Sequence, residues 1–131
     1  MTRIPNELLY TKTHEWAKKI DSNVVMMGIT AHAQEQLRDI VFVELPPLGR
    51  ELKAGAACAV VESVKAACDI FAPLSGKVVK INQQIQERPQ LVNEDPYGEG
   101  WFLHIEVSHP DEFNALLSPA QYQAISESAH Q

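Results

Sequence analysis

The fold is decided by one stretch of the chain: Val60-Val61-Glu62-Ser63-Val64-Lys65-Ala66-Ala67-Cys68-Asp69-Ile70. A lysine lies between two apolar runs, and this pattern predicts a β-hairpin, about residues 57–72, with Lys65 near its tip. Tight hairpin turns usually contain Gly or Asn because the favoured turns need positive φ angles. This turn contains neither, and it places the β-branched Val64 where a solvated turn is normally polar. A local rule broken without an evident structural gain indicates where function should be sought.

Strand patterns lie on both sides of this hairpin. The segments Gly49-x-x-Leu52-x-x-Gly55 and Gly76-x-x-Val79-x-x-Asn82 share a spacing of turn and apolar residues. They predict two similar β units that face each other across the hairpin and close one core. The remaining apolar and β-branched runs predict further strands. These expected strands cover 8–19, 24–29, 40–45, 48–55, 77–82 and 101–107, with a hairpin between the first two.

Helices are expected to be short and to dominate only the C-terminus. Thr30 is a candidate N-cap for a helix over 31–38. Residues 83–93 are weakly patterned and predict a loop with at most one helical turn. The C-terminal helices span about 110–129, with Ser108 capping the first and Ser118-Pro119 starting the second. We therefore expect a mainly β sandwich in one domain, residues 1–131.

Composition excludes some classes of partner. The chain has 17 acidic and 11 basic residues among 131, a net charge of −6. Nucleic-acid binding, which needs a basic face, is therefore not expected. No apolar run approaches the roughly 18 residues of a membrane-spanning helix, and residues 1–6 carry no signal-peptide pattern. A cytoplasmic protein that meets other proteins is the expectation.

The two cysteines, Cys58 and Cys68, do not predict a disulfide. A turn near Lys65 would place Cys58 opposite Phe71 and Cys68 opposite Val61, so the two thiols are out of register. We expect two small buried side chains in a reducing compartment.

No constellation of residues predicts an active site within the chain. There is no Gly-rich phosphate loop, no Cys-x-x-Cys and no nucleophile elbow. The five histidines lack paired metal-ligand spacing, so no metal site is expected. We expect a protein that is not itself an enzyme.

Lys65 suits a different task, that of carrying a group. A lysine that a modifying enzyme acylates must be exposed, must project from a rigid scaffold and must have small neighbours. Ser63, Ala66 and Ala67 supply such neighbours. Acylation replaces the ammonium with a neutral amide, and the tethered group gains effective concentration at partner enzymes.

Several motifs together carry a family resemblance. They are Lys12-Thr13-His14-Glu15-Trp16, Gly28-Ile29-Thr30-x-His32-Ala33-Gln34, Val41-Phe42-Val43-Glu44-Leu45-Pro46, Val61-Glu62-Ser63-Val64-Lys65-Ala66, Asp69-Ile70-Phe71-Ala72-Pro73-Leu74-Ser75-Gly76 and Leu91-Val92-Asn93-x-x-Pro96-Tyr97-x-x-Gly100-Trp101. In this order they resemble the H proteins of the glycine cleavage system over nearly the whole chain. The resemblance implies a barrel-sandwich hybrid like lipoyl and biotinyl domains, with short inserted helices and a C-terminal helical segment.

The resemblance also implies a function. Lys65 would carry covalent lipoate, attached by a lipoyl or octanoyl transferase or by a lipoate ligase. The arm would take an aminomethyl group from the pyridoxal-phosphate-dependent glycine decarboxylase to the tetrahydrofolate-dependent aminomethyltransferase. Dihydrolipoamide dehydrogenase would then reoxidise it.

Two groups of site residues follow from the resemblance. Recognition by the attaching enzyme is expected at Glu62, Ser63, Val64 and Ala66. The loaded arm is expected to rest in a cleft, where carboxylates suit a protonated amine. The expected cleft residues are Thr13, Glu15, Ile29, Leu37 and Asp69. Two positions depart from the family pattern, Gln36, where some relatives have His, and Cys68, where a residue such as Ser is common; exchange between the Cys68 thiol and the arm is a minor hypothesis.

Alternatives remain open at this point. A biotin carrier module shares the fold, but such sites usually have methionine on both sides of the lysine, whereas Lys65 lies between Val64 and Ala66. An unmodified β-sandwich interaction protein is a further possibility. So is an H-like protein that mainly relays lipoate to other enzymes.

Overall fold

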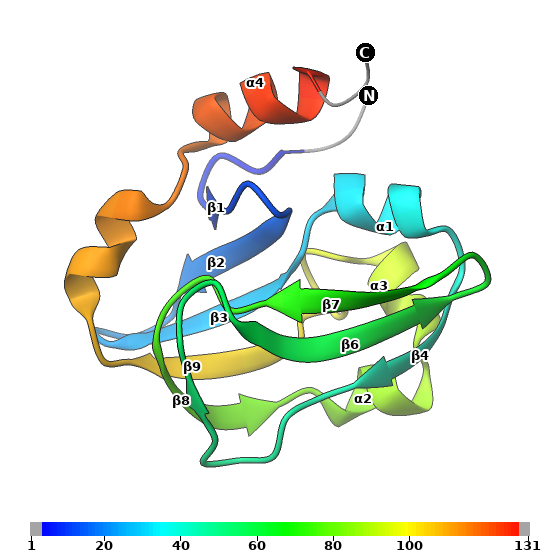
Figure 1. Cartoon of the computed structure of the whole chain (residues 1–131), viewed down its shortest axis with the longest axis horizontal. Coiled ribbons are helices and arrows are strands. Elements are labelled where there is room, and N and C mark those ends of the chain that lie inside the picture. Colours follow the sequence, from blue (N-terminus) through cyan, green and yellow to red (C-terminus); the bar gives the residue numbers. More distant parts are fainter. Residues whose placement is uncertain (1–3, 129–131) are drawn as a thin grey trace.

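The computed structural model describes residues 4–128. These residues form two antiparallel β-sheets around a common core (Figure 1). The larger sheet has the strand order β1-β2-β3-β9-β8-β5, and the smaller has the order β4-β6-β7. The strands are β1 (Leu9–Tyr10), β2 (Glu15–Lys19), β3 (Val24–Ile29), β4 (Ile40–Glu44), β5 (Glu51–Leu52), β6 (Ala57–Ser63), β7 (Ala67–Phe71), β8 (Gly76–Ile81) and β9 (Leu103–Val107).

Short helices fill the connections. They are α1 (Ala31–Leu37), α2 (Gln83–Glu87), α3 (Gln90–Glu94), the 3₁₀ helix η1 (Pro110–Ala115) and α4 (Pro119–Ser128). The Thr30 hydroxyl accepts from the Ala33 N–H, which confirms the predicted cap. The predicted loop over 83–93 is wrong. Asn82 caps α2 and Pro89 precedes α3, and the buried Ile85 anchors α2 to the core.

The N-terminal segment forms two strands where one was expected over 8–19. Strand β1 pairs with β2, and Leu9 lies opposite Ala17. Between them the chain turns through His14, whose φ of 76° is the left-handed conformation. The Thr11 N–H donates to the Glu15 carbonyl and closes this turn. The turn is what brings Glu15 to the start of β2.

The predicted half-exposed strand over 48–55 is reduced to β5. Gly49 and Gly55 have φ angles of +86° and +85°, so the chain turns sharply on both sides of Glu51–Leu52. Strand β5 pairs with β8, with Leu52 opposite Gly76. The two similar β units are therefore neighbours in one sheet, and the expectation that they face each other across the hairpin is wrong.

The central hairpin is confirmed, with β6 paired to β7 and Val61 opposite Cys68. An irregularity between Ala57 and Ala59 shifts the register, so Phe71 lies opposite Ala57 and the expected pairing of Cys58 with Phe71 is wrong. Both cysteines are free. Cys58 is buried as expected, but Cys68 is exposed, so the expectation of two buried thiols is wrong for Cys68.

Two apolar clusters hold the molecule together. The main cluster lies between the sheets and includes Val61, Ile70 and Ile105. The second cluster fixes α4 to the N-terminal strands, with the Tyr10 and Tyr122 rings stacked at 4.7 Å. Such burial is the main favourable contribution to folding.

The C-terminal segment follows the prediction only in part. The expected cap Ser108 instead hydrogen-bonds the His109 ring, and η1 is a 3₁₀ helix tied to the sheet by Glu112, which accepts from the Ser75 N–H and hydroxyl. Ser118 does cap α4, since its hydroxyl accepts from the Gln121 N–H. The predicted end near Ala129 lies outside the described residues.

Candidate functional site

The hairpin tip is held by one serine and needs no glycine. The Ser63 N–H donates to the Ala66 carbonyl at 2.8 Å. The Ser63 hydroxyl oxygen accepts from the N–H groups of Lys65 and Ala66 at 3.1 and 3.0 Å. A serine side chain bonded to the backbone two and three residues on replaces the positive φ that Gly or Asn would supply. The glycine-free turn is therefore a stable structure.

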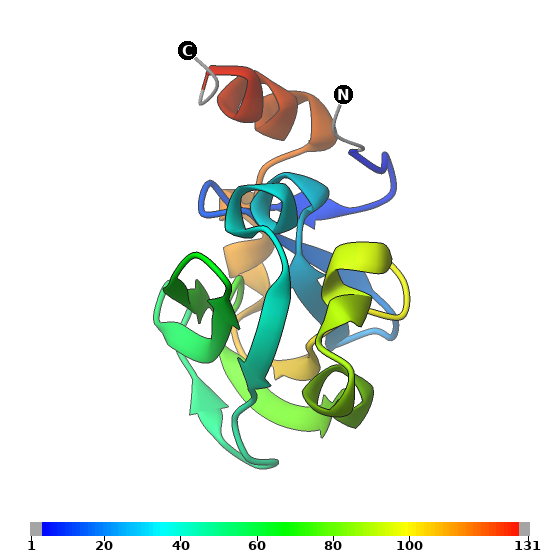
Figure 2. The same cartoon turned by 90° about the vertical axis from the view of Figure 1, so that its right-hand side faces the viewer.

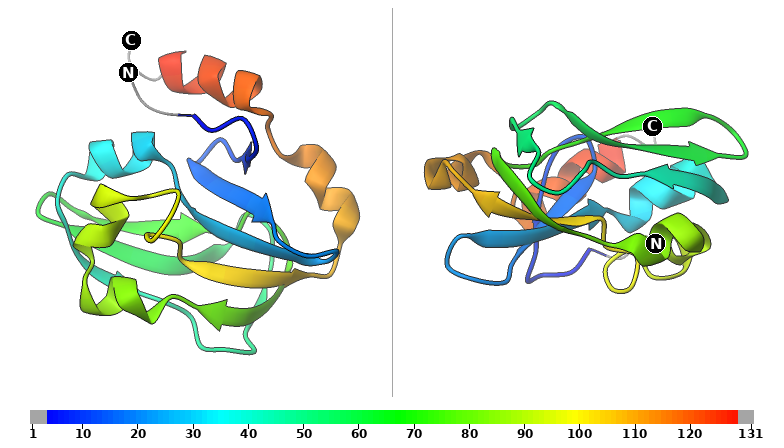
Figure 3. Two further views of the ribbon diagram at one scale, coloured as in Figure 1. Left: turned by 180° about the vertical axis from the view of Figure 1, so that it is seen from behind. Right: turned by 90° about the horizontal axis from the view of Figure 1, so that it is seen from below.

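A second element braces the tip from outside the hairpin. The Val64 N–H donates to the Asp39 carbonyl at 3.0 Å, which ties the turn to the connection between α1 and β4. That connection is itself fixed, because the Asn93 side chain donates to the Arg38 carbonyl and accepts from the Ile40 N–H. Lys65 is exposed beside a 69% exposed Val64, and the turn projects at one side of the molecule (Figures 2 and 3).

Glu15 is the unusual residue at the other end of β7. Its side chain is only 1% exposed. One carboxylate oxygen accepts from the Thr11 and Thr13 hydroxyls at 2.5 Å each, and the other accepts from the Phe71 N–H at 3.2 Å. Burial raises the pKa of the Glu15 carboxyl, and these hydrogen bonds oppose the rise.

The structure brings together part of the expected cleft. Thr13 bonds Glu15 directly, and Ile29 lies opposite Glu15 in the β2–β3 pair. Asp69 is exposed on β7, two residues from Phe71. Burial raises the pKa of the Cys68 thiol, and the charges of Asp69 and Glu15 raise it further. Leu37 instead packs, half-buried, against the main core.

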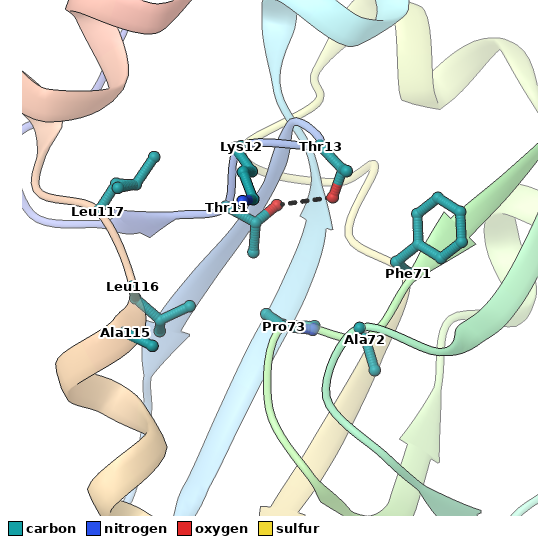
Figure 4. A pocket seen from close by; sticks show the side chains of 10 residues that line it. Thr11, Lys12, Thr13, Phe71, Ala72, Pro73, Ala115, Leu116 and Leu117 are labelled. Atoms are coloured by element: carbon teal, nitrogen blue, oxygen red, sulfur yellow. Dashed lines mark hydrogen bonds between the residues drawn. The ribbon is translucent and has the colours of Figure 1, made fainter.

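An apolar cavity of about 470 Å³ is lined in part by residues that hydrogen-bond this carboxylate (Figure 4). Thr13 and Phe71, the partners of Glu15, both line it, and Leu116 and Leu117 from the segment before α4 close one side. The complete lining is Thr11, Lys12, Thr13, Gly55, Phe71, Ala72, Pro73, Ala115, Leu116 and Leu117. Sequence reasoning missed the C-terminal residues, because segments far apart in the chain form the cavity and no local pattern signals it.

A histidine pair supports the turn that carries Thr13 and Glu15. The His14 ring lies 4.5 Å from the His32 ring, and its Nδ1 is 2.7 Å from the Tyr122 hydroxyl of α4. Burial and the neighbouring His32 lower the pKa of His14 to about 4. The positive φ of His14 was a signal that sequence alone could not provide. Among the described residues, no group of three or more His, Cys, Asp or Glu side chains could hold a metal ion.

These features define a class of protein, a carrier domain with a rigid hairpin that exposes one lysine. Comparisons with known proteins agree. The family model described as "Glycine cleavage H-protein" matches residues 8–129. This chain belongs to that family.

Curated relatives and a solved structure give the same result. The glycine cleavage system H protein of Carboxydothermus hydrogenoformans is 52% identical over 97% of both chains, and that of Xylella fastidiosa strain M12 is 49% identical over 98% of both. The crystal structure of the Mycobacterium marinum H protein matches with a TM-score of 0.81 at 36% identity, covering 92% of this chain and 97% of that one.

Family membership confirms the expected fold and role. The chain is a barrel-sandwich hybrid and a non-catalytic lipoyl carrier of the glycine cleavage system, working with the decarboxylase, the aminomethyltransferase and dihydrolipoamide dehydrogenase. Membership of this family favours lipoate, rather than biotin, as the group that the chain carries. In the described part of the chain, no helix has the length and apolar character needed to cross a membrane.

Proposed function

We propose that Lys65 is the residue to which lipoate is attached. The observation that carries this proposal is the braced, glycine-free turn, which exposes the Lys65 side chain while fixing its backbone through Ser63 and Asp39. When bound, lipoate supplies a dithiolane that accepts and releases the aminomethyl group. The chain's own contribution is to anchor the arm and to present it without obstruction by neighbouring side chains.

We infer that Glu62, Ser63, Val64 and Ala66 form the surface that the attaching enzyme recognises. Ser63 fixes the shape of the turn through its two accepted hydrogen bonds. Val64 presents apolar area next to the lysine, and Ala66 leaves room for a cleft to close. Glu62, exposed near the end of strand β6, supplies a negative charge close to Lys65.

We further propose that Glu15 receives the amine at the far end of the arm. A carboxylate has about four acceptor sites. Three donors occupy three of the sites on Glu15, which leaves about one for an ammonium group. The lipoyl-lysine arm comprises roughly a dozen bonds of about 1.5 Å, so its extended reach is about 15 Å. Asp69 lies roughly 13 Å along β7 from Lys65 at about 3.3 Å per residue. The dimensions therefore fit an arm that lies along β7 and ends beside Asp69, two residues before Phe71, the partner of Glu15.

Within this cleft each residue has a distinct role. Thr13 and Thr11 hold the Glu15 carboxylate in place, and Asp69 adds a second negative charge. Ile29, next to Glu15 in the sheet, supplies an apolar wall. Leu37 would contribute only through its exposed part. A protonated amine near Glu15 would favour the ionised carboxylate.

Glycine–carbon dioxide exchange with the decarboxylase tests the role of Lys65. We expect Lys65→Arg to abolish exchange, because the guanidinium does not form the amide, while Lys53→Arg matches wild type. Exchange by Lys65→Arg at the wild-type rate would show that the lysine assignment is wrong.

The cleft needs a separate measurement. We expect the loaded arm of Glu15→Gln to lose its aminomethyl group to water several-fold faster than wild type, because the ammonium loses its partner. Gln preserves the shape, since the Thr11 and Thr13 hydroxyls rotate to accept from its amide. An unchanged rate of loss would contradict the role of Glu15.

Two broader expectations stay proposals. We propose that residues 1–131 act as one carrier domain, which a single cooperative unfolding transition would support. We also propose the cytoplasm as its compartment, which cell fractionation tests. Relay of lipoate to other enzymes would be detected as transfer of label from this chain to a second lipoyl protein.

A further inference from the structure

Within residues 4–128, the fold leaves the outer edge of the smaller sheet uncovered along β7. The larger sheet ends in β1 and β5, which are two residues each. The smaller sheet ends in β4 and β7. Helices α2 and α3 contact β4, and the Ile40 N–H at its start donates to the Asn93 side chain. Within residues 4–128, no strand pairs with the outer side of β7, and Figure 2 shows the hairpin on the side opposite α2 and α3.

Hydrogen bonds establish which backbone groups face outward. The Ala66 carbonyl accepts from Ser63, and the Ala72 carbonyl accepts from Gly55, so the even-numbered residues of this segment face β6. Because the direction alternates along an antiparallel strand, the odd-numbered residues of β7 face away. The Phe71 N–H confirms this, since it donates to Glu15 rather than to β6.

The usable edge is therefore short and well defined. It consists of the outward N–H and carbonyl groups of Ala67 and Asp69, and we refer to it as the β7 edge. The Phe71–Glu15 bond closes it at one end and the lysine turn closes it at the other. The Cys68 thiol contacts the Asp69 carbonyl at 3.5 Å, a weak bond that a backbone N–H would replace.

Natural sheets usually block an exposed edge with proline, lysine or a covering element. Strand β7 contains neither proline nor lysine, and its Ala67, Cys68 and Asp69 are all exposed. Their small side chains leave the backbone accessible. Such an edge can accept an extended segment of another protein by β-strand addition.

We propose that the β7 edge pairs with an extended segment of the enzyme that attaches lipoate to Lys65. This inference rests on the proposed function of Lys65. The backbone pairing would begin two residues from the lysine and would fix its register in the enzyme's cleft.

The chemistry of attachment identifies this enzyme among the partners. The neutral Nζ amine attacks the carbonyl carbon of an activated lipoyl group, an acyl adenylate or a thioester held by the enzyme. The amide C–N bond forms, the bond from that carbon to the leaving group breaks, and the leaving group departs with the amine's proton. The reacting Nζ lies five bonds from Cα, about 6 Å, so the hairpin backbone itself must be positioned. The glycine cleavage enzymes act about 15 Å from that backbone, at the end of the arm, and need no such register.

Hydrogen–deuterium exchange of the unmodified full chain tests the pairing directly. The chain is mixed with saturating lipoate ligase without activated lipoate, and amide exchange is followed residue by residue. We expect exchange at Ala67 and Asp69 to slow by about tenfold or more, because both amides become bonded. The Cys68 and Ile70 amides, already directed at β6, are the internal control. Binding without slowed exchange at Ala67 and Asp69 would overturn the inference.

A proline variant gives an independent rate measurement. Ala67→Pro removes one outward N–H without removing a bond to β6, as proline is tolerated only on such edges. We expect about tenfold slower lipoylation than in Ala67→Ser, which keeps the N–H, with circular dichroism verifying both folds. Equal lipoylation rates in the two folded variants would contradict strand pairing at the β7 edge but not the assignment of Lys65. If neither wild type nor Ala67→Ser is ever lipoylated, the proposed function fails, and the inference with it.

Discussion

The two ends of β7 are built in opposite ways. At the Lys65 end the side chains are exposed, and the turn is held by backbone groups and the Ser63 hydroxyl. At the Phe71 end a carboxylate is buried, and its hydrogen bonds come from three different residues. One strand thus connects an accessible end to an enclosed, negatively charged end. Under the proposed function, this difference separates attachment of the arm from retention of its cargo.

The largest stability effect is expected at the enclosed end. Glu15→Ala leaves the Phe71 N–H and two threonine hydroxyls without their acceptor and opens a cavity. We expect the free energy of unfolding to fall by about 3 kcal/mol. Glu15→Gln, which fills the site, should change it by about 1 kcal/mol or less. Denaturant unfolding measures both, and equal losses would show that the network does not support the base of β7.

The same end should make stability depend on pH. The pKa of His14 is lowered to about 4 by burial and by His32, so the unfolded chain binds this proton more readily. Stability from His14 is therefore present above about pH 6.5 and is lost as pH falls toward 4. Burial raises the pKa of Glu15, so its contribution to stability depends on pH in the opposite sense. That contribution is present below the ordinary pKa of a glutamate and is lost as the pH rises above it.

Two variants separate these contributions. His14→Asn tolerates the positive φ and should flatten the loss of stability between pH 6.5 and 4 in thermal unfolding. Glu15→Gln removes the opposing slope. Groups facing His14 are the Tyr122 hydroxyl of α4 and the His32 ring of α1. An acid profile of His14→Asn identical to wild type would contradict the assignment.

A smaller effect is expected at the accessible end. Ser63→Ala removes the acceptor for the Lys65 and Ala66 N–H groups, which solvent then hydrates in part. We expect a loss of about 1 kcal/mol together with several-fold slower lipoylation. Val64→Ala, at a 69% exposed position, should change stability by about 0.5 kcal/mol or less. If Ser63→Ala were lipoylated at the wild-type rate, the rigidity of the turn would not matter for attachment.

The smallest effect is expected at Cys68, between the two ends. Burial and the charges of Asp69 and Glu15 raise the pKa of its thiol, so little thiolate is present at neutral pH. Exchange with a dithiolane requires the thiolate. Cys68→Ser should therefore leave the reduction rate of the arm unchanged. A clear decrease in stopped-flow measurements would revive thiol exchange.

The sequence predicted the central hairpin and its lysine well, because alternating apolar runs and a distinctive turn are local signals. The register near Lys65 was correct, with Cys68 opposite Val61. The irregularity between Ala57 and Ala59 was not predictable, since bulges depend on packing against the second sheet. Asn82 and Pro89 are start signals for α2 and α3, but the weak apolar pattern of residues 83–93 hides the two helices.

The site was predicted less completely. The family resemblance indicated Thr13, Glu15 and Asp69, yet periodicity alone assigned no role to any of them. The cavity wall at Leu116 and Leu117, and the Tyr122–His14 contact, depend on where the C-terminal segment packs. Such long-range contacts have no counterpart in a local pattern.

The most direct test of the lysine assignment is peptide-resolved mass spectrometry. The full chain is incubated with lipoate ligase, ATP and lipoate, beside Lys65→Arg. We expect one lipoyl adduct, located on the peptide that contains Lys65, and none on Lys65→Arg. An unmodified wild-type chain, or an adduct on another lysine, would contradict the role of the β6–β7 hairpin as the carrier.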